Sequence, residues 1–441
     1  MGFITNLFSV SESAGVAKVG VVRGNDALLN AFTADYQTAD GTAKAGVDYE
    51  AVSGTLHFQA NETLQTIAIP LWRNSAAKGP KNFKVTLNNA SEGIPLGAAA
   101  TQVKILHPGG YYPLPRPIGA QAKLRREEGV NLLSWEGEGV LQHADQVTGP
   151  WEDLPMVTSP YATQPSLPMG FHRILSTRPT EVYVPSGYDG KKPLPLILAL
   201  HPMSGPGGGA SANWMRGYFS LASLANSRGF LVCYPEGTVH ATWGTFWNGP
   251  DFGSFAGDVD DSGYLRGVIE EIQRQYAVDP KRIYVTGASN GAAMAHRLAG
   301  DHADLIAAIT AISNPTNYDP QSVHLSQPVH VLLIYGDDDN YQGGYADCCG
   351  LPVVAEAPGA VRTVQNWARL NGCTDPVVEA APSIDLTPDV VGLDTTVLRY
   401  TQCPPGGAVE LWTIKDGGHV PQLSDASIAR IVDWLLAHPK P

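Results

Sequence analysis

No apolar run in this sequence approaches the roughly 18–20 residues that a membrane-spanning helix requires, which excludes a helical membrane protein. Positive charge is also scarce: 29 Lys and Arg stand against 42 Asp and Glu, which leaves a formal net charge of −13. This excess of negative charge argues against nucleic acid and anionic membrane surfaces as partners. The opening segment MGFITNLFSV has neither the cationic start nor the long apolar stretch of a signal peptide.

Cysteine is equally scarce, with five copies in 441 residues and none in the C-x-x-C spacing of zinc or redox sites. Cys233 lies in the apolar run FLVCYPEG, which predicts a buried thiol in a strand. Cys373 and Cys403 flank a segment near the C-terminus, and a bridge between them would stabilise the fold by about 3–4 kcal/mol. Such a bridge would imply an oxidising compartment. The other two, Cys348 and Cys349, are adjacent.

The chain is too long for one typical domain and long enough for two or three. Its first 107 residues alternate short apolar runs with turn-forming clusters such as ADGTAKAG. In TIAIPLW the residues Ile67, Ile69 and Leu71 share one face, and in FKVTL the residues Phe83 and Val85 do the same. This period of two is typical of strands with one buried face. We therefore expect an all-β sandwich over residues 1–107.

A second region begins with the segment HPGGYYPLPRP, whose Pro and Gly content predicts a semi-rigid linker over residues 108–116. Short β runs and turn residues alternate again over residues 117–175, which predicts a small β module. Trp135 and Trp151 in this module fit polymer contacts, although tryptophans in small domains more often anchor the core.

From residue 176 to 441 continuous apolar runs, such as LPLILALH, RIYVTGAS and VHVLLIYGD, alternate with helical patterns. In DSGYLRGVIEEIQRQY the apolar residues recur at helical spacing, as in Tyr264, Leu265, Val268 and Ile269. Strands buried on both faces and separated by helices predict a mostly parallel, doubly wound sheet.

One motif in this region carries chemistry. The segment VTGASNG places Gly287-Ala288-Ser289-Asn290-Gly291 between an apolar strand and a helix-prone segment, which is the context that a G-x-S-x-G nucleophile elbow requires. Ser289 would stand at a helix N-terminus, where free N–H groups stabilise the anion of a tetrahedral intermediate. The sequence therefore predicts acyl transfer at Ser289.

A serine nucleophile needs a base, and in this fold the chain order is serine, acid, histidine. His419 is the histidine that follows a strand in a flexible loop, DGGHVPQ, from which a side chain can reach the sheet's carboxyl edge. The acid should end the strand VHVLLIYG, where Asp337, Asp338 and Asp339 follow one another. Their residue types alone do not separate these three aspartates.

The oxyanion hole requires two fixed N–H donors. The first is predicted at Asn290, the residue after the nucleophile. The second should follow the first long strand, in LHPMSGPGGG, where glycines allow the backbone to approach a substrate. We expect Met203 to supply this second donor.

The stretches SVSESAG, YQTADGTAKAGVDY, GTLHFQANETLQTIAIPL and FKVTL resemble a Calx-β module that covers roughly residues 3–107. In that family acidic residues at one end of the sandwich bind calcium, and Glu12, Asp40 and Asp48 match three of these positions. The family's later acidic cluster is replaced by WRNSAAKGPKNF, which carries Lys81 and two further cations. Because calcium takes roughly six to eight oxygens and prefers several carboxylates, we expect no metal here and a structural or spacer role.

Residues 176–441 resemble the α/β-hydrolase group that contains feruloyl esterases and polyhydroxybutyrate depolymerases. The resemblance lies in VYVPSGYDGKKPLPLILALHPMSG, GDVDDSGYLRGVIEEIQRQYAVDPKRIYVTGASNGAAMAHRLA, LLIYGDDDN, VQNWARLNGC and the GGH loop. It implies an α/β-hydrolase fold and a Ser–Asp–His triad that needs no cofactor. The family pattern G-x-x-D, counted from Gly336, selects Asp339 as the acid.

The same resemblance implies a Cys373–Cys403 disulfide, from NGC and YTQC, and substrate-binding positions at Trp247, in FWNGP, and at His201. Two departures concern the cleft. The family loop H-x-W-P reads HVPQ here, which removes one aromatic wall. The oxyanion loop reads His201-Pro202 instead of H-G, and since proline has no N–H the donor must be Met203 or a later residue.

We therefore expect a secreted, monomeric serine carboxylic-ester hydrolase. Three substrate classes stay open: hydroxycinnamoyl esters of cell-wall polysaccharide, aliphatic polyesters such as polyhydroxybutyrate, and aromatic polyesters such as poly(ethylene terephthalate). The aromatic residues Trp243, Phe246 and Trp247 favour an aromatic acyl group. The β modules suggest an alternative of another class, a polymer-binding or adhesion protein without activity, but the intact order of Ser, Asp and His argues against it.

Overall fold

The computed structural model describes residues 1–23, 31–60, 62–72, 81–91, 95–106, 109–114, 123–127, 130–134, 140–144, 152–154, 161–163, 171–175, 178, 180–205, 208, 211–240, 243–250, 259–316, 323–339, 359–374, 378–388, 390 and 392–441. The chain divides into two compact units. The first contains Met1–Tyr112, Tyr183–Pro193 and Arg274–Ala277, and the second contains Pro113–Val182, Leu194–Gln273 and Val278–Pro441.

The first unit contains an all-β sandwich. One sheet has five strands in the order β2-β8-β7-β4-β5, and the other has three in the order β1-β3-β6. All of these pairings are antiparallel except the β2–β8 pair. The strands are β1 Gly2–Phe3, β2 Leu7–Ser11, β3 Val16–Val22, β4 Phe32–Asp40, β5 Ser53–Phe58, β6 Leu64–Pro70, β7 Lys81–Asn88 and β8 Ala100–Leu106, with a short 3-10 turn at Glu12–Ala14.

The core of this sandwich follows the predicted alternation. Phe83 and Val85 of β7 are buried, and so are Ile67 and Ile69 of β6, while the residues between them are more exposed. Tyr49 stacks on Phe83 with ring centroids 4.0 Å apart. Each fully buried side chain of this size stabilises the fold by about 1.5–3 kcal/mol, so the unit has a hydrophobic core of its own.

Within residues 117–175 the described elements are short strands in two three-stranded sheets, β10-β11-β14 and β13-β12-β15. Their bounds are β10 Lys123–Glu127, β11 Val130–Ser134, β12 Val140–Ala144, β13 Glu152–Asp153, β14 Tyr161–Thr163 and β15 Phe171–Leu175. These strands agree with the short β runs read from the sequence. The exact borders of a module in this region stay a prediction, and Trp135 and Trp151 lie outside the described residues.

A ten-stranded sheet forms the centre of the region that follows, in the order β24-β25-β26-β23-β22-β21-β17-β18-β16-β9. Its strands are β9 Gly110–Pro113, β16 Glu181–Val184, β17 Leu194–Leu200, β18 Leu231–Cys233, β21 Val278–Ala288, β22 Ala308–Ile312, β23 His330–Gly336, β24 Val378–Ile384, β25 Thr395–Tyr400 and β26 Val409–Ile414. A separate hairpin pairs β19 Thr238–His240 with β20 Gly244–Phe246.

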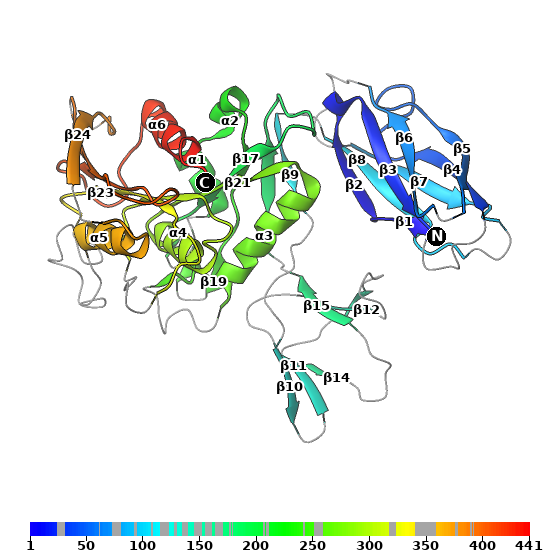
Figure 1. The fold of residues 1–441 in the computed structure, drawn as a ribbon, viewed down its shortest axis with the longest axis horizontal. Coiled ribbons are helices and arrows are strands. Elements are labelled where there is room, and N and C mark those ends of the chain that lie inside the picture. Colours follow the sequence, from blue (N-terminus) through cyan, green and yellow to red (C-terminus); the bar gives the residue numbers. More distant parts are fainter. Residues whose placement is uncertain are drawn as a thin grey trace. The chain divides into compact units, whose positions relative to one another are not determined.

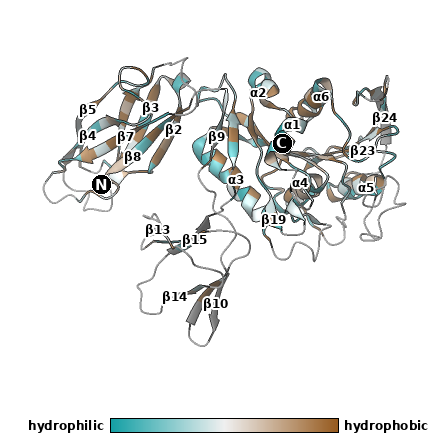
Figure 2. Cartoon of the chain, turned by 180° about the vertical axis from the view of Figure 1, so that it is seen from behind, coloured by the Kyte–Doolittle hydropathy of each residue, from teal (hydrophilic) through white to brown (hydrophobic). Residues whose placement is uncertain are grey.

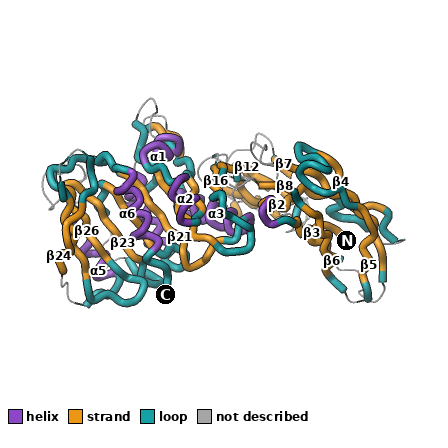
Figure 3. Tube along the Cα trace, turned by 90° about the horizontal axis from the view of Figure 1, so that it is seen from above, coloured by secondary structure: helices purple, strands orange, loops and turns teal. Residues whose placement is uncertain are grey.

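Helices cover both faces of this sheet. In Figure 1, α1, α2 and α6 lie on one side of its strands, and α4 and α5 lie on the other. Figure 3 shows α6 lying along β21 and β23, and it contacts β22 between them. The helices are α1 Ala212–Tyr218, α2 Ala222–Arg228, α3 Asp261–Gln275, α4 Asn290–Asp301, α5 Ala360–Leu370 and α6 Asp425–Leu436.

The strands between the helices are apolar throughout. In β17, β22 and β23 every residue is buried. Figure 2 shows β23 mostly in brown, whereas α3 shows both teal and brown. The predicted apolar stripe of α3 is confirmed, because Tyr264, Leu265, Val268 and Ile269 are all buried. This is the expected pattern for a parallel sheet covered on both faces.

The order of the parallel strands places the site. From β18 the sheet runs through β17, β21, β22 and β23 to β26, all parallel to their neighbours. The chain order therefore reverses between β17 and β21, and such a switch point opens a crevice at the carboxyl ends of the strands. The predicted α/β-hydrolase fold after an all-β sandwich is confirmed, and Ser289 follows β21 at this switch point.

Candidate active site

The turn after β21 holds Ser289 in a strained conformation. Its φ of 50° and ψ of −119° lie outside the regions that ordinary residues prefer. A Cβ added to Gly287 would collide with the carbonyl oxygen of Gly291, and one added to Gly291 would collide with that of Leu200. Both glycines are therefore required by close backbone contacts, and the sharp turn directs Ser289 outward at the start of α4.

The predicted triad residues come together. His419 Nε2 lies 2.9 Å from Ser289 Oγ, and His419 Nδ1 lies 2.9 Å from Asp339 Oδ2. Because an ionised carboxylate only accepts hydrogen bonds, Nδ1 carries the proton and Nε2 accepts from the serine hydroxyl. This is the tautomer that a general base needs in order to remove the proton from Ser289.

The structure separates the three aspartates that follow β23. Asp339 is 2 % exposed and directs its carboxylate to the imidazole. Asp337 is exposed and accepts a hydrogen bond from the amide of Asp416 at 2.6 Å, which ties together the loops that carry the acid and the base. The amide of Asp338 donates to the carbonyl of Gly417 at 3.1 Å. The turn after β23 therefore sets the position of Asp339, and the contacts of Asp337 and Asp338 brace that turn.

The loop that carries His419 is also hydrogen-bonded to the residue that follows β22. The amide of Val420 donates to Ser313 Oγ at 3.1 Å, and Ser313 directly follows β22. Both residues have positive φ, 54° for Val420 and 57° for Ser313. Positive φ is uncommon for serine and a genuine outlier for a β-branched residue. Sequence reasoning missed Ser313, because nothing in an apolar strand end marks a serine as a loop anchor.

The oxyanion region is built around two buried residues. Asn290 begins α4, where the first N–H groups of a helix have no partner inside it. Its side chain pairs with the backbone of Trp247: Oδ1 accepts from the amide at 2.7 Å, and Nδ2 donates to the carbonyl at 2.8 Å. The Trp247 indole N–H donates to the carbonyl of His201 at 3.0 Å. Trp247 thus connects the segment after the nucleophile with the segment after β17.

His201 is locked as a neutral ring. The amide of Gly237 donates to its Nε2 at 2.9 Å, so the proton sits on Nδ1, which donates to the carbonyl of Pro202 at 2.8 Å. Burial lowers the pKa of His201 to about 4. Met203, the predicted second donor, follows Pro202 and is half-buried. His201 and Trp247 have fully buried side chains, so the structure places them behind the oxyanion segments and gives no support to direct substrate contact.

The cysteines agree with expectation where the structure describes them. Cys373 and Cys403 form a disulfide with Cα atoms 4.0 Å apart, which confirms the predicted bridge. Cys233 is a buried free thiol in β18, also as predicted. Cys348 and Cys349 lie outside the described residues.

Two of the three carboxylates that match calcium positions, Asp40 and Asp48, are bound by other groups of the protein. Asp48 is fully buried and binds the ammonium of Lys81, whose Nζ lies 2.8 Å from Oδ1 and 3.1 Å from Oδ2. Asp40 Oδ1 accepts from the Tyr49 hydroxyl and from the amide of Ala45, both at 2.9 Å. Among the described residues no group of three or more His, Cys, Asp or Glu side chains could hold a metal ion.

Across the described part of the chain, no helix combines the length and the hydrophobicity needed to cross a membrane.

Comparison with known proteins divides the chain in the same way as its fold. Residues 1–108 match the Calx-beta domain family, and residues 180–322 match the family described as Esterase PHB depolymerase. Feruloyl esterase B of Piromyces equi is 30% identical over 249 residues, which are 54% of this chain and 42% of that protein. A bifunctional acetylxylan esterase/xylanase of Neocallimastix patriciarum is 28% identical over 37% of this chain and 22% of its own length.

The chain therefore matches less than half the length of these two relatives. Among solved structures, the acetyl xylan esterase from Aspergillus awamori is similar at 16% identity and a TM-score of 0.40, over 59% of this chain and 94% of that one. Residues 1–108 are thus similar to Calx-beta domains, and residues 180–322 are similar to the Esterase PHB depolymerase family, in a chain whose fold joins an all-β sandwich to an α/β-hydrolase sheet.

Proposed function

We propose that this protein is a serine carboxylic-ester hydrolase that acts through an acyl-enzyme. One observation carries the proposal: Ser289 Oγ, His419 and Asp339 form a continuous hydrogen-bonded chain, with both distances at 2.9 Å, on a strained turn between a strand and a helix. A serine hydroxyl is a weak nucleophile that needs such an oriented base. The side chain of His419 is 31% exposed while the side chain of Asp339 is 1% exposed, so an ester can approach the base while the acid stays sheltered.

In the first half of the reaction His419 Nε2 takes the proton of Ser289 Oγ as that oxygen bonds to the ester carbonyl carbon. The carbonyl oxygen becomes an anion that faces the amides of Asn290 and Met203. Asp339 stabilises the imidazolium without taking its proton. Collapse of the intermediate breaks the bond to the alcohol, which leaves with the proton from Nε2. The acyl group stays on Ser289.

In the second half a water molecule replaces the alcohol. His419 Nε2 removes its proton while the oxygen bonds to the acyl carbon, and collapse returns the proton to Ser289 Oγ and releases the acid. Each half passes through one oxyanion, so donors fixed at Asn290 and Met203 would lower both barriers.

For the substrate class we propose acyl esters on plant polysaccharide, with a hydroxycinnamoyl group as the first candidate. The names of the two curated relatives support this class, since one is a feruloyl esterase and the other acts on acetylated xylan. A surface feature near the base also supports a polymeric substrate. Trp214 of α1 is 37% exposed and stacks on Tyr218 at 4.9 Å, and the Tyr218 hydroxyl donates to the carbonyl of Pro421, two residues after His419.

An exposed indole whose orientation is already fixed by stacking offers a binding surface to a sugar ring at little entropic cost. Replacing Trp214 by Ala should raise KM for feruloylated arabinoxylan fragments while KM for methyl ferulate stays unchanged. Equal effects on both substrates would argue against a polysaccharide contact at Trp214 and would leave polyesters as the competing class.

The decisive experiment compares wild type with Ser289→Ala on p-nitrophenyl butyrate and methyl ferulate, and labels both proteins with a fluorophosphonate. We expect hydrolysis and labelling by the wild type and neither by the variant. A wild type that neither hydrolyses esters nor reacts with the probe would refute the proposal and favour a polymer-binding protein that has lost its activity.

A further inference from the structure

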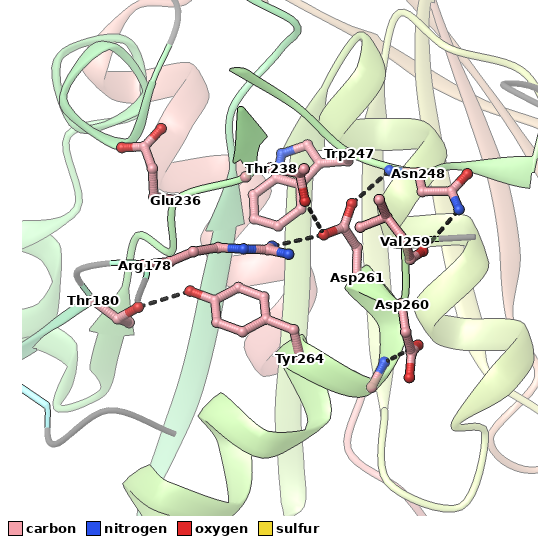
Figure 4. Close-up of polar contacts among 12 residues, drawn as sticks. Arg178, Thr180, Glu236, Thr238, Trp247, Asn248, Val259, Asp260, Asp261 and Tyr264 are labelled. Atoms are coloured by element: carbon pink, nitrogen blue, oxygen red, sulfur yellow. Dashed lines mark hydrogen bonds and ion pairs between the residues drawn. The ribbon is translucent and has the colours of Figure 1, made fainter. Parts of the chain in front are cut away.

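The side chain of Asp261, the first residue of α3, is fully buried and bound by three donors from three separate segments. Its Oδ1 accepts from Arg178 Nη1 at 2.6 Å and from Thr238 Oγ1 at 2.8 Å, and its Oδ2 accepts from the amide of Asn248 at 2.7 Å. Figure 4 shows this carboxylate between the Arg178 guanidinium and the Asn248 backbone. Burying a charge is costly, and the cost is offset only when hydrogen bonds and an opposite charge are held in good geometry around it.

The Arg178 guanidinium is itself fixed. It lies over the ring of Tyr264 at 4.1 Å, and the Tyr264 hydroxyl shares a 2.8 Å hydrogen bond with Thr180 Oγ1 (Figure 4). The Arg178 side chain is only 11% exposed, and Asp261 supplies a counter-charge at 2.6 Å that helps to offset the cost of this burial. The pair therefore forms a rigid support and not a mobile surface bridge.

What this support holds is the segment of Trp247 and Asn248. Asn248 is bound through its amide to Asp261, through its side-chain Nδ2 to the carbonyl of Val259 at 2.8 Å, and through its own carbonyl to Arg297 Nη1 at 2.6 Å. The preceding residue, Trp247, makes the reciprocal pair of hydrogen bonds with the Asn290 side chain. Asn248 thus fixes the position of the adjacent Trp247 backbone, to which the Asn290 side chain is hydrogen-bonded.

Trp247 also contacts the segment after β17, because its indole N–H donates a hydrogen bond to the carbonyl of His201. The segments that supply both predicted oxyanion donors are therefore attached to one residue, and that residue is anchored through its neighbour to Asp261. Oxyanion stabilisation depends steeply on donor position, and a displacement of about 1 Å can cost about 10²-fold in rate.

We propose that Asp261 and Trp247 act together as positioning residues for the oxyanion hole, so that their contacts set the rate of the chemical step and not only the stability of the fold. This inference rests on the proposed ester hydrolysis. Neither side chain touches the substrate. Asp261 holds the Asn248 amide, and Trp247 transmits that position to Asn290 and to the segment of His201.

The test uses the full chain and three variants. Asp261→Asn keeps the shape but presents an amide with one acceptor to donors that now bind two acceptor oxygens. Trp247→Phe keeps a buried ring but removes the indole N–H from the His201 carbonyl. Tyr264→Phe is the matched control, because it removes a buried hydrogen bond from the same cluster without touching the path from Asp261 to Asn290.

We expect kcat on p-nitrophenyl butyrate to fall about tenfold or more in Asp261→Asn and in Trp247→Phe, with KM little changed, since an interaction made only in the transition state has been weakened. Affinity for a trifluoromethyl ketone, which adds to Ser289 and places an oxyanion in the hole, should fall by the same factor. Tyr264→Phe should lower the melting temperature while kcat and inhibitor affinity stay at the wild-type level.

If Asp261→Asn fails to fold, Trp247→Phe decides alone against the same control. Activity that falls equally in all three variants and tracks their melting temperatures would overturn the proposal, because the cluster would then be merely structural. Full activity in both test variants would overturn it as well. An inactive wild type would instead refute the proposed ester hydrolysis, so the two failures are distinguishable.

Discussion

The ion pair between Lys81 and Asp48 makes a prediction about the Calx-beta domain that can be worked out from its geometry. The carboxylate has no exposed surface, while the Lys81 side chain is 24% exposed. Replacing Lys81 by Met keeps most of the volume but removes the charge that neutralises Asp48. Breaking a fully buried pair costs about 3–5 kcal/mol. Because water reaches this lysine, we discount that range to about 2–4 kcal/mol.

Hydrogen exchange by mass spectrometry on the full chain measures this cost locally, in peptides that cover Asp48 and β7. The matched control is Asp48→Asn combined with Lys81→Met, which removes both charges and should recover most of the lost opening free energy. The coupling energy from the cycle of single and double variants then isolates the pair. A cost below about 1 kcal/mol for Lys81→Met would show that the pair behaves as a solvated surface bridge, and would refute the reasoning.

The same pair predicts the response to calcium. Since the Lys81 ammonium already neutralises the buried carboxylate, millimolar calcium should leave the melting temperature of the wild type unchanged, and a chelator should have no effect. A metal that bound only the folded domain would stabilise it by mass action, so a calcium-dependent rise of several degrees would contradict a lysine in the role of the cation.

Three further predictions concern the hydrolase domain. Asp339→Asn should lower kcat by about 10³–10⁴-fold with little change in melting temperature, because the amide supports the wrong imidazole tautomer; stopped assays on p-nitrophenyl butyrate measure it, and a loss below tenfold would argue against this acid. Val420→Gly should raise the stability by about 1 kcal/mol by relieving a positive φ, yet lower kcat because the loop of the base gains freedom. Burial lowers the pKa of His201 and of His330 to about 4 and that of His296 to about 3, so these three rings stay neutral in the fold but take up protons below about pH 6.5 when unfolded. Unfolding free energy should thus fall by about 3–4 kcal/mol per pH unit from pH 6 to 4, and His296→Gln should remove about a third of that slope; a flat profile in urea titrations would contradict the burial of these rings.

The sequence was informative where a residue type and its neighbours demand one chemistry. The elbow around Ser289 and the loop of His419 could be predicted because the turn needs small residues and because the base must follow a strand. The acid was different. Asp337, Asp338 and Asp339 have the same chemistry and adjacent positions, and only the hydrogen bonds of the turn decide which carboxylate faces the imidazole. The family pattern G-x-x-D selected Asp339, whereas the residue types alone did not distinguish the three aspartates.

Trp247 and Asp261 show the opposite limit. A tryptophan near a cleft is easily interpreted as a substrate contact, but its contacts to Asn290 and His201 depend on segments far apart in the chain. Asp261 looks like an ordinary acidic residue in the first turn of an amphipathic helix. Its partners, Arg178 and the Asn248 amide, lie 83 and 13 residues away. No local pattern predicts hydrogen bonds between residues so far apart in the chain, because these residues meet only when the sheet is assembled.

The positive φ angles around Ser289 and His419 mark where this domain gives up stability. Among the described non-glycine residues, Ser289, Ser313, Asp416 and Val420 combine this conformation with positions on the loops of the triad. Strain of this kind costs about 1–3 kcal/mol at each unfavourable residue. Glycine adopts positive φ without this cost, so the side chains at Ser289 and Val420 are present at a cost of about 1–3 kcal/mol each. The strained backbone lies where the fold brings a hydroxyl, an imidazole and a carboxylate together, and stability is given up there in exchange for a fixed direction of these side chains.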